Sequence, residues 1–286
     1  MNKGILLKLI VINALSICQN HTSAQPNPFV DAEIIETLRL VNVARKLSRL
    51  DTVTLSATLS SGCHKHAQYL GYNKNNPLTK GLNAHNEHPT LYGYTKEGEK
   101  AGKASDIHYI FPGYAIDDFL ASFYHRIPLL QPDLKEIGIG YFNTPDDKVV
   151  VTVLDCVRGI GETDNYQEIV VLPEENQTNV PLRMGNEIPN PTPEKIIDCG
   201  YPITIYFANQ QTVQNVAIEL KNRLGQTIPL YVSTPQQPAT AWNQWNTICA
   251  IAQNPLQPKQ KYTVNLTCVV DGINWVKKWS FYTVLE

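Results

Sequence analysis

Residues 122–141 read SFYHRIPLLQPDLKEIGIGY, and this stretch decides the fold of the first half of the chain. A helix is predicted from about residue 115 to residue 125, because apolar residues recur there at helical spacing. These residues are Ile116, Phe119, Leu120 and Phe123. Pro128 ends that helix, because proline has no N–H to donate. Strands are expected over 137–142 and 149–154, and the second is a β-branched run typical of a strand buried on both faces.

Two more helices precede this stretch. Asp31 begins the first, which carries apolar residues at helical spacing, and the second runs from about Ser56 to Gly71. From there to about Gly113 the chain is rich in glycine and proline, so we expect a long ordered loop region. Loops of this length in compact domains are often functional.

The chain changes character after residue 158. Residues 159–195 hold a cluster of prolines and are expected to form an extended connector, with an edge strand at 169–172. Residues 196–286 consist of short strands and turns, which predicts a β-sandwich. The fold class is therefore α+β, with a signal segment over 1–24, a first domain over 30–158, the connector, and an all-β domain over 196–286.

The N-terminus predicts export. Lys3 and Lys8 supply the basic start, residues 5–15 form a short apolar stretch, and small residues at 22–24 offer a cleavage site for signal peptidase. An alternative is a lipoprotein anchored at Cys18, although Ile17 is large for the position before a lipidated cysteine. No later segment is long and apolar enough to cross a bilayer. We expect a secreted, periplasmic or extracellular protein.

Composition narrows the possible partners. The 286 residues are 43% hydrophobic and 17% charged, as in a folded globular protein, and the formal net charge is −2. Without a basic stripe, nucleic acid is not an expected partner. Five cysteines follow Cys18, namely Cys63, Cys156, Cys199, Cys249 and Cys268. None stands in a CxxC pair, so a zinc ribbon is not expected. A disulfide among the last three of them stays open.

Three motifs in the first domain share an order and spacing with a known family. They are Leu40-Val41-Asn42-x-x-Arg45, the segment from Ala84-His85-Asn86-Glu87 to Ala101-Gly102, and Ser122-x-x-His125-Arg126 followed by Ile137-Gly138-Ile139-Gly140. Together they span about residues 34–156. This region resembles the bacterial branch of the CAP superfamily (cysteine-rich secretory proteins, antigen 5 and pathogenesis-related 1 proteins). The resemblance implies an α-β-α sandwich. Residues 255–264 resemble those of bacterial immunoglobulin-like (Ig-like) modules.

The resemblance also implies a cleft with two histidines and two glutamates that can hold a divalent metal. By position, His85 and His125 match the histidines and are the candidate metal ligands, for zinc or calcium. Glu97 matches the first glutamate, although Glu87 and Glu99 compete for the role. Ser122 stands where the second glutamate is expected, so the set of four is incomplete and no metal or other cofactor is certain.

Simpler interpretations compete at each position. His125 at a helix end either caps backbone carbonyls or faces the cleft. Arg126 is better explained as a structural ion-pair partner than as a residue that clamps a substrate. The four tryptophans of the second domain either pack in its core or form a platform for carbohydrate (Trp242, Trp245, Trp275 and Trp279).

Three functions remain open. The first is a non-enzymatic exported protein that binds a small apolar ligand, a divalent metal or a cell-surface partner in the histidine-lined cleft. The second is a hydrolase that uses the histidines with a glutamate. Against it, no GxSxG motif accompanies a base, although Ser122 and His125 could be neighbours on one helix. The third is a protein that binds carbohydrate or cell wall through the β domain.

Overall fold

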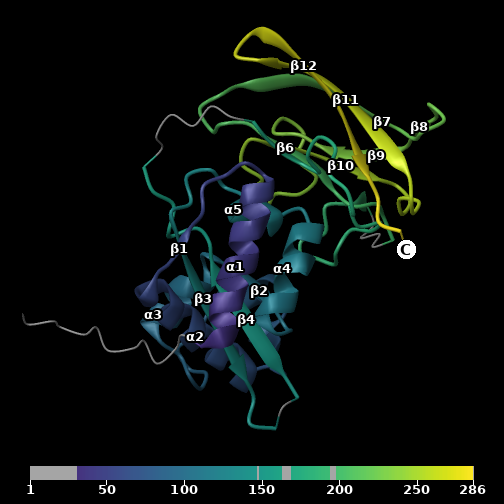
Figure 1. Ribbon diagram of the computed structural model, residues 1–286. Coiled ribbons are helices and arrows are strands. Elements are labelled where there is room, and N and C mark those ends of the chain that lie inside the picture. The colour runs from purple at the N-terminus through teal and green to yellow at the C-terminus, as the bar shows by residue number, and fades with distance from the viewer. Residues whose placement is uncertain (1–30, 147, 163–168, 194–197, 286) are drawn as a thin grey trace, which may run out of the picture.

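The computed structural model of the chain describes residues 31–146, 148–162, 169–193 and 198–285. The expected signal segment and Cys18 lie outside these residues. Within them, no helix combines the length and the apolar character that crossing a membrane requires. Figure 1 shows helices and a small sheet built from the first half of the chain, with the strands of the second half stacked above them.

The first domain is built on a four-stranded sheet in the order β1-β3-β4-β2. Strand β1 pairs in parallel with β3, whereas β3–β4 and β2–β4 are antiparallel. The bounds of these strands are Thr54–Leu55, Glu136–Asn143, Val150–Asp155 and Ser105–His108 in that order. Both predicted strands are confirmed as β3 and β4.

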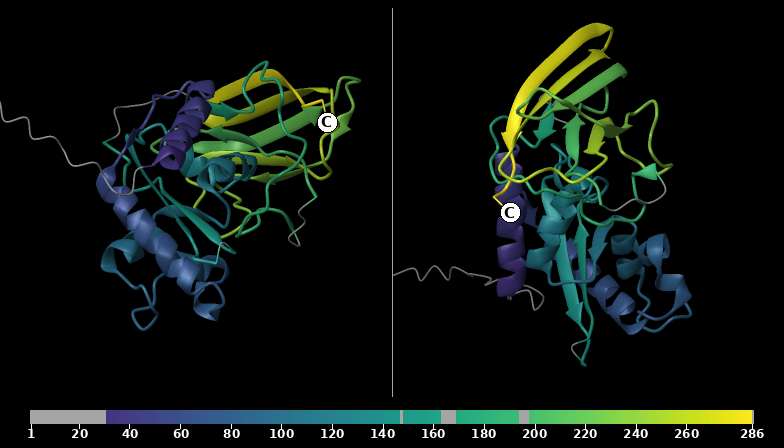
Figure 2. Two further views of the ribbon diagram at one scale, coloured as in Figure 1. Left: turned by 60° about the horizontal axis from the view of Figure 1, so that its bottom comes forward. Right: turned by 90° about the vertical axis from the view of Figure 1, so that its right-hand side faces the viewer.

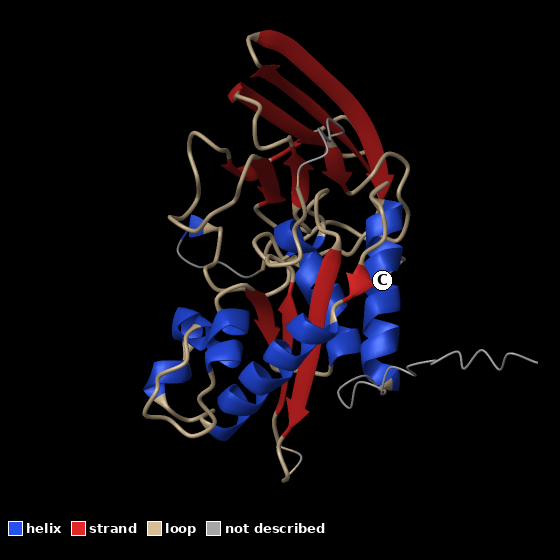
Figure 3. Cartoon of the chain, turned by 90° about the vertical axis from the view of Figure 1, so that its left-hand side faces the viewer, coloured by secondary structure: helices blue, strands red, loops and turns tan. Residues whose placement is uncertain are grey.

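Helices cover both faces of this sheet (Figure 3). Ile137 and Ile139 of β3 pack on one side against α1 and α4, while Val151 and Val153 of β4 pack on the other against α2. The helices and 3-10 turns are α1 Ala32–Leu47, α2 Ala57–Tyr72, η1 Pro77–Thr79, η2 Gly81–His85, α3 Lys96–Gly102, α4 Pro112–Ala121 and α5 Arg126–Leu129. The predicted α-β-α sandwich is therefore present.

The two glycines of β3 let α2 approach the sheet closely. A Cβ added at Gly140 would lie 2.6 Å from the Cys63 carbonyl carbon, and one at Gly138 would lie 2.6 Å from the Leu59 Cβ. Any side chain at these positions would push the helix away, because packed interiors have no room to spare. The alternation of isoleucine and glycine in residues 137–140 thus fixes which helix each face receives.

The predicted helix over 115–125 is shorter than expected. Helix α4 ends at Ala121, and α5 begins only at Arg126. The reason is that the N–H groups of Phe123 and Tyr124 donate to the Glu187 carboxylate instead of to helix carbonyls. His125 therefore stands at a break between two helices, and Pro128 lies within α5 without ending the predicted helix.

The second domain is a sandwich of two four-stranded sheets in the described residues, ordered β5-β6-β10-β9 and β12-β11-β7-β8. Figure 2 shows the long curved hairpin of β11 and β12 on its outer side. The predicted strands and the edge strand in the connector are confirmed, and Asp271-Gly272 turns the hairpin. The bounds are β5 Val170–Leu172, β6 Ile203–Tyr206, β7 Val213–Lys221, β8 Thr227–Ile228, β9 Leu230–Ser233, β10 Thr247–Ala252, β11 Lys261–Val270 and β12 Ile273–Tyr282.

The inner sheet of the sandwich is buried on both faces, so the two domains share an interface. In β10, Ile248 and Ala250 face the sandwich core, while Cys249 and Ile251 pack with Phe123 against the first domain. This explains why every residue of β10 is buried. Because successive side chains point to opposite faces, one strand serves both cores.

Arg126 fastens the interface. Its guanidinium donates to the carbonyl of Pro202 at 2.6 Å and to Thr204 Oγ1 at 3.2 Å, both in the second domain. It also lies over the Tyr201 ring at 4.5 Å. The structural role expected for Arg126 is thus served by backbone and aromatic contacts, which join the domains.

The five cysteines of the described residues are buried and carry no disulfide. Cys199 and Cys249 belong to the interdomain cluster, whereas Cys268 lies in the sandwich core. The possible bridge among these three is therefore not formed in this structure.

Candidate functional site

A cleft opens where the two domains meet, and two adjoining hollows lined by described residues make it up. The first, which we call the aromatic hollow, has a volume of about 260 Å³ and is lined on one side by Trp242 and Trp245. The second, which we call the lysine hollow, has a volume of about 670 Å³, with Lys74, Lys80 and Lys148 in its lining. Both are lined by His85, His125 and Ile188, which therefore stand where the hollows join.

His85 reaches the cleft from the end of η2. Its Nδ1 lies 2.9 Å from the Gly102 carbonyl oxygen. A carbonyl can only accept, so Nδ1 carries the proton and Nε2 keeps its lone pair. Burial lowers the pKa of His85, and the nearby charge of His125 lowers it further, although the bond to Gly102 opposes this. A neutral imidazole with an oriented ring is the form that binds a metal.

His125 enters the cleft from the break between α4 and α5. Its ring stacks on Phe119 with centroids 5.2 Å apart, and its Nδ1 lies 3.4 Å from Glu187 Oε2. Burial disfavours the imidazolium, but the Glu187 hydrogen bond and the charges of Asp106 and Glu187 outweigh it, so the pKa of His125 is raised. Nδ1 faces an acceptor, which directs Nε2 away from Glu187.

Glu187 is the acidic residue that the sequence did not reveal. It lies in the connector, its side chain is fully buried, and its two oxygens accept from Phe123 N at 2.6 Å and Tyr124 N at 2.8 Å. The Glu187 carboxylate thus lies beside His125, although the resemblance implied a glutamate at position 122, where this chain has Ser122. No spacing rule connects residue 187 with residue 125, and only the docking of the connector brings them together.

Asp106 is a second acidic group that the sequence did not reveal. It lies on β2, is 6% exposed, lines the aromatic hollow, and accepts from the Cys156 thiol at 3.4 Å. Burial raises the pKa of Asp106 to about 7, against the opposing charge of His125. The cleft therefore holds a carboxyl group that can gain or lose a proton near neutral pH.

Ser122 lies beneath the cleft and not in it. Its side chain is 1% exposed, and Oγ donates to the Phe119 carbonyl at 2.8 Å while lying 3.2 Å from His125 Nδ1. The hydroxyl proton points to a backbone carbonyl, and no substrate can reach the oxygen. Ser122 and His125 are neighbours as expected, but their geometry does not suit a nucleophile and its base.

Glu97 is placed away from the cleft, which corrects its sequence-based assignment. It is exposed on α3, forms an ion pair with Lys65 at 3.7 Å, and lines neither hollow. The physical reason is that α3 turns Ala101 and Gly98 toward the core and leaves Glu97 outside. Glu99 is also outside, where it pairs with Lys103 and Tyr94.

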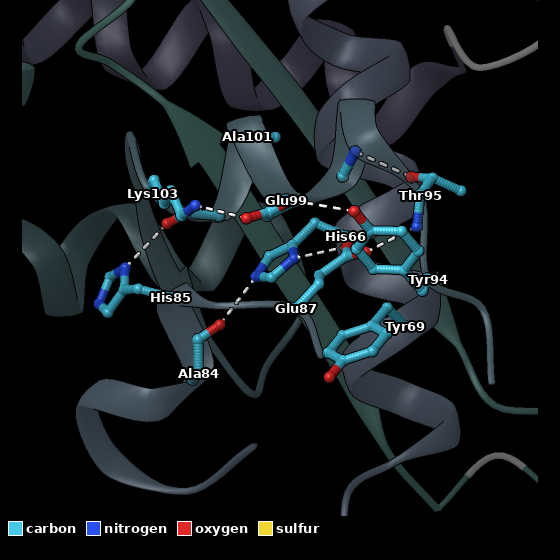
Figure 4. A network of polar contacts seen from close by, with 12 residues as sticks. His66, Tyr69, Ala84, His85, Glu87, Tyr94, Thr95, Glu99, Ala101 and Lys103 are labelled. Carbon is cyan, nitrogen blue, oxygen red and sulfur yellow. Dashed lines mark hydrogen bonds and ion pairs between the residues drawn. The ribbon is translucent and has the colours of Figure 1, made fainter. Parts of the chain in front are cut away.

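Glu87, the other competitor for this role, is buried beside His66 (Figure 4). Its Oε1 lies 2.9 Å from His66 Nδ1, and the Ala84 carbonyl accepts a hydrogen bond from His66 Nε2 at 2.8 Å. Both ring nitrogens are thus used within the protein. A Cβ on Gly102 would lie 2.5 Å from the ring, so this glycine permits the close approach of α3. The pair joins three segments of the core beside the cleft.

The described residues contain no group of three or more His, Cys, Asp or Glu arranged to hold a metal ion. His85 and His125 therefore supply two candidate ligands, each through Nε2. A divalent ion bound by these two imidazoles would need water or a bound molecule for its remaining ligands.

Residues 38–156 match the model of the cysteine-rich secretory protein family, CAP. No curated protein matches the chain. Among solved structures, an outer surface protein from Borrelia burgdorferi is 19% identical, with a TM-score of 0.33 over 44% of this chain and 92% of that one. An extracellular protein containing an SCP domain from Bacillus anthracis is 20% identical, with a TM-score of 0.32 over 43% of this chain and 40% of that one.

Proposed function

Residues 38–156 of this chain are a CAP domain of the cysteine-rich secretory protein family, and from that premise we propose that the chain is an exported, non-enzymatic binding protein. Its cleft takes up a small ligand or a divalent ion between the two domains. The observation that carries the proposal is that His85 and His125, from separate segments, line the same cleft while each uses Nδ1 within the protein. Their Nε2 atoms are left for a ligand.

A divalent ion is the simplest occupant. His85 would bind it through Nε2 with the Gly102 carbonyl fixing the ring, and His125 would do so with Glu187 behind it. Acceptors of this kind behind a histidine set its tautomer and increase its affinity for metal. A bound ion would supply a positive charge for an anionic group of a second ligand.

Calorimetry with zinc chloride and calcium chloride tests this step. We expect one of the two ions to bind the wild-type chain, and the double variant His85→Ala plus His125→Ala to bind it at least about tenfold more weakly. His88→Ala is the matched control, because His88 is an exposed loop histidine bonded to Thr90. Equal affinity in wild type and double variant would remove the metal from the proposal.

Apolar ligands are tested separately. The lining of the lysine hollow combines apolar residues, among them Ile107, Val149 and Val150, with its three lysines. Such a mixture suits a molecule with an apolar body and a polar or anionic end. We expect dodecanoate to bind wild type and to lose affinity in Val150→Asp. Unchanged binding in that variant would place the apolar ligand outside this hollow.

Hydrolysis is the second candidate, favoured by one observation. Asp106 and His125 line the same hollow, and burial raises the pKa of one while carboxylates raise that of the other. Such pairs can serve as general acid and base. Esterase and peptidase substrates test it: activity that falls in both His125→Ala and Asp106→Asn would replace the binding function with a catalytic one.

Export is tested at the N-terminus of the protein recovered from its native source. Mass spectrometry is expected to find a chain that starts near residue 25, outside the cytoplasm. A chain that starts at Cys18 with a lipid mass would establish the anchored alternative, and an intact Met1 start would contradict export.

A further inference from the structure

We propose that the aromatic hollow is a subsite for a pyranose ring, with Trp242 as the platform on which the sugar stacks. The inference rests on the proposed function, because it names the chemistry of a ligand that the cleft would hold. It gives the second domain a direct part in binding, beyond its packing against the first.

The four tryptophans of the second domain separate into two kinds. Trp279 is 2% exposed in the sandwich core and its Nε1 donates to the Pro173 carbonyl at 3.0 Å. Trp275 packs edge-on against Phe207 at 5.3 Å. Trp242 and Trp245 instead line the cleft, and Trp242 is 40% exposed. An exposed indole at the wall of a hollow has apolar surface still to be covered.

Trp242 is held in place before any ligand arrives. Thr240 Oγ1 accepts from its backbone N–H at 3.1 Å, and the same hydroxyl lies 2.7 Å from the Tyr124 hydroxyl in the first domain. The ring also leans on His85, with centroids 5.7 Å apart at 42°. A platform fixed in this way loses little conformational freedom on binding, which favours affinity.

Trp245 adds evidence from its backbone. Its φ is 46°, a left-handed conformation that a bulky residue rarely adopts. The Asn243 side chain supports the turn by accepting from the Trp245 N–H at 2.9 Å. Strain of this kind persists where the surrounding structure enforces it and often marks binding sites. Here the strained turn sets both indoles at one hollow.

The polar groups of the hollow complement a sugar. A pyranose has a face of C–H groups, which stacks on an indole, and a rim of hydroxyls that both donate and accept hydrogen bonds. Ser105, Asp106 and Asn243 line the hollow. The Ser105 hydroxyl donates to the Ala101 carbonyl at 2.6 Å, so it can still accept from a sugar hydroxyl. The Asn243 side-chain oxygen accepts from the Trp245 N–H, and its amide nitrogen can donate to a ligand. Few, placed polar groups around an aromatic wall are what orient a ligand in a pocket.

The size and the connection of the hollow fit one ring of a longer ligand. About 260 Å³ accommodates a single hexose, and the hollow continues past His85 and His125 into the lysine hollow. A glycosidic substituent can therefore leave the first ring along the cleft. We expect an oligosaccharide to bind more tightly than a monosaccharide for this reason.

Nuclear magnetic resonance of the four indole N–H groups tests the proposal on the full two-domain chain. The probes are chitotetraose, cellotetraose and maltotetraose, each titrated separately. At least one is expected to shift the Trp242 and Trp245 signals while those of Trp275 and Trp279 stay still. If none of the three shifts the Trp242 signal, or if Trp275 responds instead, the saccharide subsite is wrong.

Variants complete the test. We expect Trp242→Ala to lower the affinity for the tetrasaccharide by about tenfold. Trp242→Phe should lower this affinity less, because an aromatic ring remains. Trp275→Phe is the matched control and should bind as wild type does. Equal affinity in Trp242→Ala and wild type would overturn the proposal. Zinc or calcium affinity should persist in Trp242→Ala, so the failure of the saccharide subsite and that of the histidine site can be told apart.

Discussion

The described residues include two histidine–glutamate pairs, which differ in how many imidazole nitrogens are bonded within the protein. In the pair His66–Glu87, both side chains are 0% exposed and both ring nitrogens form hydrogen bonds within the protein. In the pair His125–Glu187, the glutamate is equally buried but the histidine side chain is 16% exposed at a cleft. The imidazole of the first pair is bonded through both nitrogens, whereas that of the second pair has Nε2 available for a ligand.

The comparison shows that residue type and pairing do not by themselves identify a site. A histidine bonded through both nitrogens holds segments together, and its removal should affect folding. A histidine bonded through one nitrogen and open at the other can also bind. The source of the glutamate differs too: Glu87 belongs to the CAP domain, while Glu187 comes from the connector and exists at the cleft only because the second domain is docked.

The largest effect is expected from Glu87→Ala. It strips His66 of its carboxylate and leaves the Thr95 N–H without the acceptor it now has at 2.8 Å. Breaking a hydrogen-bonded network of fully buried side chains costs about 3–5 kcal/mol, at the large end of single-substitution effects. Urea denaturation should show a loss of this size in the free energy of unfolding. A loss below about 1 kcal/mol would mean that the buried pair is not structural.

A smaller effect is expected from Glu187→Ala. The variant leaves the N–H groups of Phe123 and Tyr124 without their acceptor, and a buried donor without a partner costs about 1–3 kcal/mol. Unlike Glu87→Ala, it should also weaken metal binding, because His125 loses the group that orients it.

Glu175→Gln is the matched control for that variant, since Glu175 is an exposed residue of the same connector. Both the free energy of unfolding and the metal affinity should equal those of wild type. If Glu187→Ala lost stability while binding metal as wild type does, Glu187 would be structural in the same sense as Glu87.

The helices and strands could be predicted from the sequence wherever the residues of one element form a local pattern of apolar spacing. Helical spacing placed α1 and α2, and the apolar runs over 137–142 and 149–154 placed β3 and β4. His85 and His125 could be proposed for one cleft because short motifs surround them, and both line the hollows. Glu97 was misplaced because a motif does not say which face of α3 is buried.

The positions of Glu187 and Trp242 beside the cleft histidines could not be predicted, for a different physical reason. Each meets its histidine only through the packing of β10 and the connector against α4 and α5. That contact joins segments far apart in the sequence, and neither residue stands in a motif of its own. The early end of α4 has the same origin, since Glu187 takes the N–H groups that would have continued the helix.

The third effect depends on pH and concerns Asp106. Because burial raises the pKa of this group to about 7, the folded protein keeps a proton that the unfolded chain releases near pH 4. Its contribution to stability is thus full at acid pH and is lost as pH rises toward 7. Asp106→Asn removes this loss, so the stability of the variant relative to wild type should be unchanged near pH 4 and should rise steadily up to about pH 7.

Chemical denaturation at several pH values measures the difference between variant and wild type. Asp117→Asn, an exposed position on α4, is the control and should show no such trend. A constant difference across the range would mean that Asp106 does not exchange its proton in the folded cleft.

The smallest effect is expected from Glu97→Gln. Glu97 is exposed and pairs loosely with Lys65, and exposed ion pairs contribute little to stability. Stability and metal affinity should both be unchanged within error. A clear loss of metal affinity would return Glu97 to the cleft and contradict its placement on the outer face of α3.

The measurement that tests the account most directly is the tautomeric state of the three histidines, read from the ¹⁵N chemical shifts of their rings at about pH 9, where histidines are generally neutral. His85 and His125 should carry their proton on Nδ1 and leave Nε2 bare, because Gly102 and Glu187 accept from Nδ1. His66 should carry a proton on Nε2, because the Ala84 carbonyl accepts there. A protonated Nε2 on His85 or His125 would contradict the claim that these two histidines are left open for a ligand.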